Sequence, residues 1–209
     1  MKTYEDLNKD QEFYLGDLFT LERYRQFARH LPNHAKNVLD VGCHIGRGGK
    51  EIKSIRKDLI LYGLDCVQDF LDKIPTDVYS HKIYVESTLN ISLENSSMDA
   101  IVAGEFIEHL YPQDVDKTLR EFFRLLKPGG SVLLTTPNPN YLVLKLTGKG
   151  VIGGPHVSEH YISNLRKQLK EIGFSKVKFL GSGKVSRIFG ENFPLLLMYG
   201  SYLAIASKD

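Results

Sequence analysis

The stretch VLDVGCHIGRGG, residues 38–49, decides the fold class of this chain. Its first half predicts a short buried strand, Asn37–Val41, and a cluster of glycines follows at once. Glycine lets the backbone turn tightly and approach a ligand closely. A helix predicted over Lys50–Lys57 would point unpaired N–H groups and the positive end of its dipole toward that ligand. The stretch therefore predicts a strand, a ligand-binding loop and a helix in that order.

Strand and helix signals alternate along the rest of the chain. Further strands are predicted at Leu59–Leu64, Ile83–Val85, Asp99–Gly104, Ser131–Thr136, Lys176–Leu180 and Tyr202–Ala206. Apolar residues at three-to-four spacing predict helices over residues 18–31, 115–126 and 162–172. This order predicts an α/β fold with a doubly wound, mostly parallel sheet and helices on both faces. Ligands bind beyond the carboxyl ends of the strands in such sheets.

Length and charge narrow the class of protein further. The chain has 209 residues, and 27 Lys and Arg against 25 Asp and Glu give a net charge of +2. We expect residues 1–209 to form a single domain, with residues 1–34 as an N-terminal helical segment. The balanced charge disfavours a protein that coats nucleic acid. Two cysteines, Cys43 and Cys66, form no disulfide framework, which favours a reducing, cytoplasmic location.

Membrane insertion and secretion are also disfavoured by the sequence. The first residues carry mixed charges and no apolar core of a secretory signal. The most apolar run, residues 192–207, is shorter than the ~20 residues that a membrane-spanning helix needs. It also contains Pro194 and Gly200. We expect no transmembrane segment.

An acidic residue points to the kind of ligand. Asp65 ends the second predicted strand, roughly 20 residues after the glycine loop, where a carboxylate accepts hydrogen bonds from ribose hydroxyls. The dinucleotide fingerprint G-x-G-x-x-G fails in every register of the loop. The pattern is instead Asp40-x-Gly42-x-x-x-Gly46. A carboxylate at that strand end favours a cationic neighbour, and S-adenosylmethionine carries a sulfonium and an ammonium group.

Five segments together resemble class I S-adenosylmethionine-dependent methyltransferases. They are VLDVGCHIGRGG, YGLD (62–65), MDAIVAGEFIEHL (98–110), LREFFRLLKPGGSVLLTTPN (119–138) and HYISNLRKQLKEIGF (160–174). The resemblance covers roughly residues 35–180 and is strongest to the small-molecule branch that includes ubiquinone-biosynthesis O-methyltransferases. It implies a Rossmann-like, seven-stranded sheet whose last strand is antiparallel. It also implies S-adenosylmethionine as cofactor and S-adenosylhomocysteine as product.

The resemblance assigns cofactor contacts to individual positions. Gly42 and Gly46 match the loop glycines that wrap the methionine part of the cofactor. Asp40 matches the acidic residue that organises the loop and the cofactor amino group, and Asp65 matches the ligand of the ribose diol. Glu105 falls where the methionine pocket is lined.

Two positions depart from the family pattern. His44 replaces the middle glycine of the loop, so its side chain is expected to point away from the cofactor or to cap it. Ser87 stands where the family usually has an aspartate that contacts adenine, and Thr88 follows it. A non-catalytic binding protein with a degenerate cofactor site is therefore one alternative.

The catalytic candidates are His109 and Glu108. Methyl transfer to a hydroxyl needs a general base, for which histidine is the usual residue. His156 and His160 complete the pool of histidines, and Glu105 lies one helical turn before Glu108 and His109. Two carboxylates and a histidine can also hold a divalent cation. Plain packing of His109 is the third alternative, and the metal content stays open.

The acceptor is expected to be a small molecule methylated at oxygen. Residues 140–160 carry several glycines and form a candidate lid loop. Apolar residues at Tyr141–Leu146 and Phe193–Met198 predict either packing into the core, or an acceptor pocket and a membrane-facing lip for a lipid-linked acceptor. The protein would then be peripheral to a membrane.

A DNA, RNA or protein acceptor is the weaker alternative. Asn138-Pro139-Asn140-Tyr141 resembles the Asn-Pro-Pro-Tyr motif of nucleic-acid amino-methyltransferases. That motif follows strand 4 in those enzymes, whereas here it follows the fifth predicted strand. The identity of the acceptor and the oligomeric state stay open.

Overall fold

The structure, a computed structural model, describes residues 1–10, 18–183 and 185–209. Residues 11–17 of the predicted N-terminal helical segment lie outside the described residues. The strands are β1 (Asn37–Val41), β2 (Ile60–Asp65), β3 (His81–Tyr84), β4 (Met98–Gly104), β5 (Leu126–Pro137), β6 (Lys176–Ser182) and β7 (Ser201–Ser207). The helices are α1 (Tyr4–Asn8), α2 (Leu18–His30), α3 (Arg47–Ile55), α4 (Gln68–Asp72), α5 (Pro112–Leu125), α6 (Leu142–Thr147), α7 (Ile162–Ile172), α8 (Ser186–Phe189) and the 3-10 turns η1 (Ile107–His109) and η2 (Leu196–Met198).

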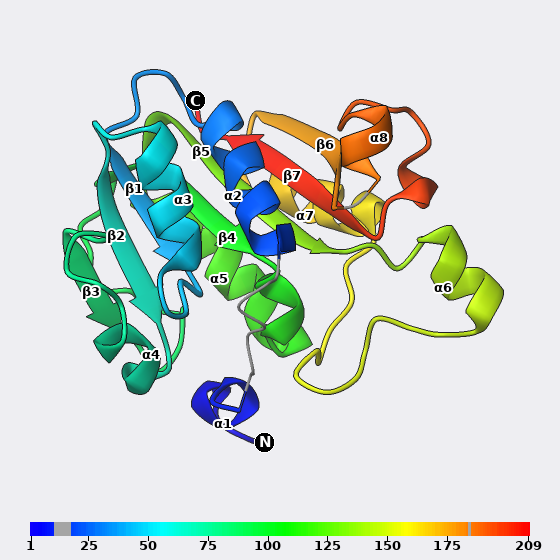
Figure 1. Ribbon diagram of the computed structural model, residues 1–209, viewed down its shortest axis with the longest axis horizontal. Coiled ribbons are helices and arrows are strands. Elements are labelled where there is room, and N and C mark those ends of the chain that lie inside the picture. Colours follow the sequence, from blue (N-terminus) through cyan, green and yellow to red (C-terminus); the bar gives the residue numbers. More distant parts are fainter. Residues whose placement is uncertain (11–17, 184) are drawn as a thin grey trace.

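Seven strands form one sheet in the order β3-β2-β1-β4-β5-β7-β6 (Figure 1). Strand β7 runs antiparallel to its neighbours β5 and β6. The other neighbouring pairs are parallel. The predicted fold class, including the antiparallel last strand, is confirmed.

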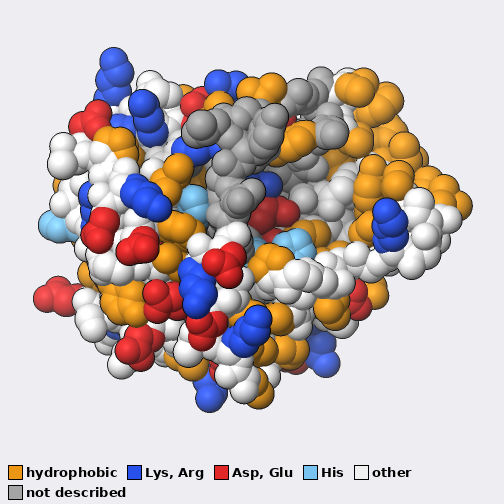
Figure 2. Space-filling view, turned by 60° about the horizontal axis from the view of Figure 1, so that its bottom comes forward, with side chains coloured by type: hydrophobic (Ala, Val, Ile, Leu, Met, Phe, Trp, Pro, Cys, Tyr) orange, Lys and Arg blue, Asp and Glu red, His pale blue; other side chains and the backbone are white. Residues whose placement is uncertain are grey.

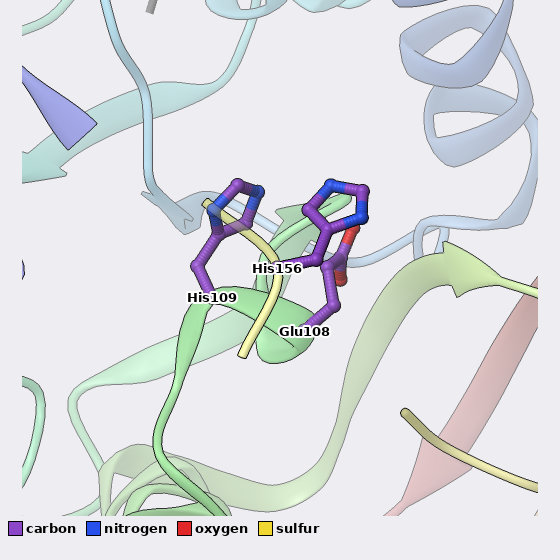
Figure 3. A group of neighbouring side chains, drawn as sticks. All are labelled: Glu108, His109 and His156. Carbon is purple, nitrogen blue, oxygen red and sulfur yellow. The ribbon is translucent and has the colours of Figure 1, made fainter. Parts of the chain in front are cut away.

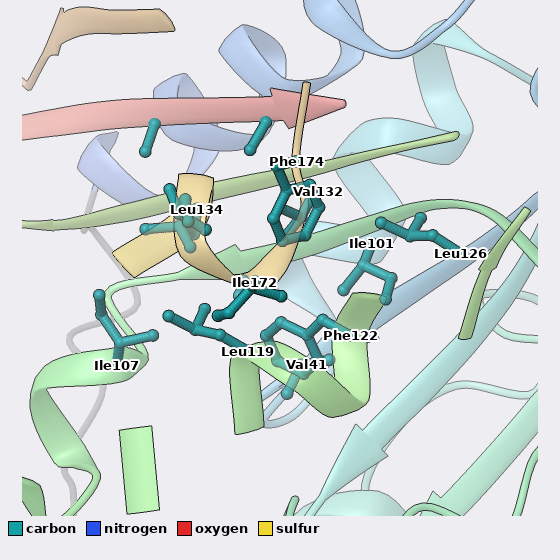
Figure 4. Close-up of a cluster of buried hydrophobic side chains, with 14 of the residues drawn as sticks. Val41, Ile101, Ile107, Leu119, Phe122, Leu126, Val132, Leu134, Ile172 and Phe174 are labelled. Atoms are coloured by element: carbon teal, nitrogen blue, oxygen red, sulfur yellow. The ribbon is translucent and has the colours of Figure 1, made fainter. Parts of the chain in front are cut away.

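Two layers of helices cover the sheet, because the side chains of each buried strand alternate between its faces. On one face, α2, α3 and α4 pack through residues such as Phe27 and Ile52 onto Val38 of β1. On the other face, α5 and α7 pack through residues such as Phe122 onto Leu39 (Figure 1). Figure 4 shows part of this second cluster, with Leu119 and Phe122 of α5 beside Val41 of β1.

The predicted strands are all present, and β5 differs most from its predicted bounds. It begins at Leu126 instead of the predicted Ser131, so residues 126–130 also belong to the strand. A register shift separates the Met98–Leu126 pair from the Ala100–Ser131 pair, and Gly129 has a φ of +80°. A bulge therefore absorbs the extra residues.

Short helices account for most of the elements that the sequence did not predict. Helices α4, α6 and α8 have four to six residues each, which is too short for an apolar periodicity to show. Helix α3 begins at Arg47, before the predicted Lys50. In the described residues, no helix combines the length and the apolar character needed to cross a membrane.

The sheet order reverses between β1 and β4, which lie side by side at its centre. The connections that follow these two strands lead to opposite halves of the sheet, and such a switch point leaves a crevice at the carboxyl ends of the strands. The glycine loop follows β1 and Glu105 follows β4. The fold therefore brings two of the predicted cofactor segments together.

Candidate active site

A cavity opens at the carboxyl ends of β1, β2 and β4. Most of the predicted site residues line it, namely Gly42, His44, Asp65, Ser87, Thr88, Glu105 and His109. A second cavity shares Gly42, His44, Glu105 and His109 with the first and continues toward α2 and His156. Figure 2 shows this face of the molecule, with acidic and histidine side chains in a hollow. The predicted residues thus meet at one site, although they come from separate segments.

The glycine loop needs glycine at two positions. Gly42 has a φ of +71°, and a Cβ atom there would lie 3.0 Å from the ring of Phe106. Gly46 has a φ of +80°, and its Cβ would lie 2.8 Å from Ile74. A side chain at either position would meet both backbone strain and a neighbouring side chain. At Gly42 it would also project from the wall that the two cavities share.

His44 forms part of the cavity wall. Its φ is +48°, and its ring packs on Phe70 with 3.9 Å between the ring centroids. Its backbone N–H donates a hydrogen bond to Asp65 Oδ2 at 2.8 Å. Burial lowers the pKa of His44 to about 4, helped by the charges of Lys73 and Arg47, so the ring is neutral at pH 7. The imidazole therefore caps the cavity without adding a charge.

Asp65 lies at the end of β2 with its carboxylate held by backbone amides. Besides the His44 amide, the N–H of Val67 donates to Oδ1 at 3.0 Å. Burial raises the pKa of Asp65 above its usual value, and these hydrogen bonds oppose the shift. The carboxylate lines the cavity and retains lone pairs for hydroxyl donors.

Ser87 and Thr88 follow β3 at the far end of the same cavity. Ser87 Oγ accepts a hydrogen bond from the N–H of Leu89 at 3.2 Å. Thr88 is buried, and its hydroxyl lies 2.9 Å from the hydroxyl of Thr118 on α5. Both hydroxyls thus also serve local structure.

Three predicted site residues, Asp40, Gly46 and Glu108, line neither cavity, and Asp40 lies in the core beneath the loop. Its fully buried carboxyl group accepts hydrogen bonds from Tyr24 Oη at 2.7 Å and Tyr79 Oη at 2.5 Å. Burial raises the pKa of Asp40 to about 7. Because residues alternate along β1, the side chain of Asp40 lies on the α2 face of the sheet, beneath the loop.

Glu105 follows β4 with a φ of +50°. Its N–H donates to the carbonyl and hydroxyl oxygens of Thr135, both at 3.0 Å. Ser201 Oγ donates to Glu105 Oε2 at 3.2 Å, and Arg23 Nε of α2 lies 3.6 Å from Oε1. Arg23 also lines the second cavity. Arg23 of helix α2 therefore belongs to the site.

Glu108 and His109 of η1 lie beside His156 (Figure 3). Glu108 is fully buried, and Thr136 Oγ1 donates to its Oε2 at 2.9 Å. Burial, and then the charge of Glu105, raise the pKa of Glu108 well above its usual range. Burial, and then the charge of His156, lower the pKa of His109 to about 4. The rings of His109 and His156 are 4.9 Å apart.

This group could hold a divalent cation. One ligand atom each from Glu108, His109 and His156 lie within 4.8 Å of one another. Neutral imidazole nitrogens and a carboxylate are ligands for several transition metals. The group differs from the predicted pair of carboxylates with a histidine, because His156 stands in place of Glu105.

The end of the candidate lid loop is tied to η1. The N–H groups of Val157 and Ser158 donate to the Glu108 carbonyl at 2.9 and 3.1 Å. His160 Nε2 lies 3.1 Å from the Ile107 carbonyl and 2.9 Å from Ser158 Oγ. His160 is therefore a structural histidine, whereas His156 reaches the second cavity.

A third cavity continues from the second, with which it shares Arg23 and His156. Its apolar lining includes Phe19, Tyr141, Leu144, Val151 and Val185. The predicted apolar segment 141–146 therefore reaches a cavity that adjoins the site.

Asn138, which begins the Asn-Pro-Asn-Tyr segment, serves the turn after β5. Its Nδ2 donates to the carbonyls of Leu196 and Tyr199, and its Oδ1 accepts from the N–H of Asn140. The side chain is buried in these contacts.

Comparison with known proteins identifies the family. The sequence model of the methyltransferase domain family matches residues 15–178. The chain belongs to this family, which confirms the predicted methyltransferase class.

Relatives and solved structures agree with this membership. The mitochondrial ubiquinone biosynthesis O-methyltransferase of Dictyostelium discoideum is 27% identical over 159 residues, which are 68% of this chain and 48% of that protein. The chain spans about half the length of the curated relatives it matches.

Two solved structures show the fold. One is an S-adenosylmethionine-dependent methyltransferase from Archaeoglobus fulgidus, with a TM-score of 0.70, 21% identity and coverage of 90% of this chain and 92% of that one. The other is phosphoethanolamine N-methyltransferase 2 of Haemonchus contortus in complex with S-adenosyl-L-methionine, with a TM-score of 0.71, 15% identity and coverage of 100% and 60%.

Several residues of the site had no signal in the sequence. Tyr4 and Asn8 of α1 and Phe70 of α4 line the first cavity. Arg23 and Tyr24 follow the periodicity of an ordinary amphipathic helix. Only the packing of these helices against the sheet edge reveals their place.

Replacing Asp40 with Asn tests the burial of its carboxyl group. The Asp40 carboxyl group binds its proton more tightly in the folded state than in the unfolded chain. The protonated group therefore stabilises the fold fully below about pH 4, and this contribution is lost as the pH rises through about 7. We expect the unfolding free energy of wild type, relative to Asp40→Asn, to fall between pH 5 and 7.5 in urea titrations.

The other titratable groups that act on Asp40, Tyr24, Tyr79 and Asp65, are unchanged in this pair of proteins. The nearby thiol of Cys43 is also unchanged. A stability difference that stays constant over this pH range would contradict the assigned environment.

Proposed function

We propose that this chain, acting as a single methyltransferase domain, transfers a methyl group from S-adenosylmethionine to the oxygen of a small-molecule acceptor. The observation that carries the proposal is the cavity where the Gly42 turn, Asp65 and Glu105 meet beside a second cavity. The choice of oxygen is supported by the Dictyostelium relative. A nitrogen acceptor, as named for the Haemonchus enzyme, is the alternative.

The residues of the first cavity fit the parts of the cofactor. Asp65 presents a carboxylate for the ribose hydroxyls, and Ser87, Thr88 and Phe70 would surround the adenine end. At the other end, Gly42 gives a close backbone approach. Arg23 and Glu105 bring a cation and an anion near the same turn, suited to the carboxylate and ammonium of a methionine group.

When bound, S-adenosylmethionine supplies an electrophilic methyl group on its sulfonium. The chain's contribution is to hold the acceptor in line and close to that methyl group. The lid loop, residues 140–160, would exclude water from the second cavity. His109 is neutral at pH 7, the form that accepts the proton of an acceptor hydroxyl, and Glu108 and His156 lie beside it.

Calorimetric titration tests cofactor binding. We expect S-adenosylmethionine and S-adenosylhomocysteine to bind wild type with micromolar affinity, and NAD not to bind. Asp65→Ala removes the ribose acceptor, and Gly42→Val fills the turn, so both variants should bind at least about 100-fold more weakly. No binding by folded wild type at millimolar ligand would overturn the proposed function.

His109→Ala tests the catalytic assignment. Methyl transfer to a panel of phenolic and amine acceptors, followed as S-adenosylhomocysteine release, should fall about 100-fold or more. The cofactor Kd should stay within about threefold. His81→Ala, at an exposed position on β3, is the control and should retain full activity.

A chelator distinguishes whether His109 in the Glu108–His109–His156 group acts as a metal ligand or as a general base. Loss of wild-type activity in EDTA, restored by a divalent cation, would assign His109 to a metal site, whereas no effect would assign it as a general base. Full activity of His109→Ala would contradict both.

The acceptor is proposed to be apolar and lipid-linked, and the protein to act peripherally at a membrane. The third cavity supports this, because its apolar wall adjoins Arg23 and His156. Exposed hydrophobic residues lie on the elements around it, namely Leu142, Val143, Leu146, Ile188, Phe189, Leu195 and Leu197. Helix α6 packs against η2, and Figure 2 shows hydrophobic side chains gathered on one side of the hollow.

Leu146→Glu tests this surface. A charge on an exposed apolar helix face opposes insertion into a bilayer. We expect wild type to cosediment with phosphatidylcholine–phosphatidylglycerol vesicles and the variant to bind about fivefold less. Ile55→Glu, at an exposed position on α3, is the matched control. A wild type that stays in the supernatant would refute membrane binding.

A further inference from the structure

Asp40 is an acidic residue inside an apolar layer. It lies between Leu39 and Val41 of β1, whose side chains join the cluster on the opposite face of the sheet. Its own face is packed with residues such as Val38, Leu61 and Ile52. A buried carboxyl group is costly unless its hydrogen bonds are satisfied. The hydroxyl groups of Tyr24 and Tyr79 supply one hydrogen bond to each oxygen.

The glycines that follow the loop leave room for these two tyrosines. A Cβ atom at Gly48 would lie 2.2 Å from the ring of Tyr24, and one at Gly49 would lie 2.3 Å from the ring of Tyr79. Gly63 of β2 is equally constrained, since its Cβ would lie 2.8 Å from Tyr79. The glycine pair at the start of α3 thus leaves room for the two rings, and Gly48 also lines the second cavity.

The two tyrosines reach Asp40 from different parts of the fold. Tyr24 comes from α2, directly after Arg23, and lines the second cavity. Tyr79 comes from the segment between α4 and β3. Both rings pack against glycines in the first turn of α3, and this packing holds the loop that connects β1 to this helix. The Asp40 carboxyl group itself lines neither cavity.

We propose that Tyr24 and Tyr79 are positioning residues for the cofactor site, which hold Asp40 and the turn of α3 so that the Gly42 loop is formed before the cofactor binds. This inference rests on the proposed binding of S-adenosylmethionine. Asp40 then acts through the loop backbone rather than by touching the cofactor. A preformed loop binds more tightly because less ordering is required on binding.

Tyr24→Phe and Tyr79→Phe test the proposal, because each keeps the ring and removes one hydroxyl group. We expect each variant to be folded and to bind S-adenosylhomocysteine about tenfold more weakly by calorimetry. Tyr199→Phe is the matched control. Tyr199 is also buried, packs its ring on Gly181 and donates its hydroxyl to the Gly190 carbonyl, away from the loop. The Kd of Tyr199→Phe for S-adenosylhomocysteine should stay within twofold of wild type, even if its Tm falls as much as that of Tyr24→Phe or Tyr79→Phe.

Substitutions of Asp40 provide the rescue. Asn keeps an acceptor for one phenol and a donor for the other, so Asp40→Asn should recover most of the affinity that Asp40→Leu loses. Tyrosine variants with a lower Tm and wild-type affinity would overturn the positioning role. Failure of wild type itself to bind would instead refute the proposed function.

Discussion

The hydrogen bond from the His44 amide to the Asp65 carboxylate joins the two strand ends on which the cofactor cavity depends. Strands β1 and β2 are parallel neighbours, so their carboxyl ends are adjacent. The N–H groups of Gly42 and Cys43 also donate to the Leu64 carbonyl of β2, so the loop after β1 is tied to β2 at several points. With His44 and Val67 both donating to Asp65, a carboxylate at the cavity wall is fixed before any ligand arrives.

Three buried acidic side chains lie in or beside this site, and each is hydrogen-bonded by a different kind of donor. Asp40 is hydrogen-bonded by two phenols, Asp65 by two amides and Glu108 by the hydroxyl of Thr136. Burial raises the pKa of all three carboxyl groups. Perturbed acids gathered at one sheet edge are typical of functional sites.

The three cavities follow one another, because the second shares lining residues with both the first and the third. The first ends at Ser87 and Thr88, the second lies between α2 and the histidines, and the third is bordered by α6. Arg23 and His156 lie where the second and third meet. In the proposed function, a nucleoside group in the first cavity and an apolar acceptor in the third would lie on either side of the second cavity, which His109 lines. Nothing in the family membership alone specifies this arrangement, because a fold hosts many acceptors.

The sequence by itself determined the fold class and predicted the segments that are proposed to bind the cofactor. Apolar runs that alternate with amphipathic helices specify a doubly wound sheet, and Gly42, Asp65 and Glu105 lie at strand ends that such a sheet must bring together. Only the tertiary structure decided the positions of Arg23, Tyr24 and His156 at the site, and it showed that two tyrosines hold the Asp40 carboxyl group. Their partners are distant in the chain, and their spacing is that of ordinary helix, strand or loop residues. Local patterns report which face of an element is apolar, but a side-chain hydrogen bond depends on how separate elements pack.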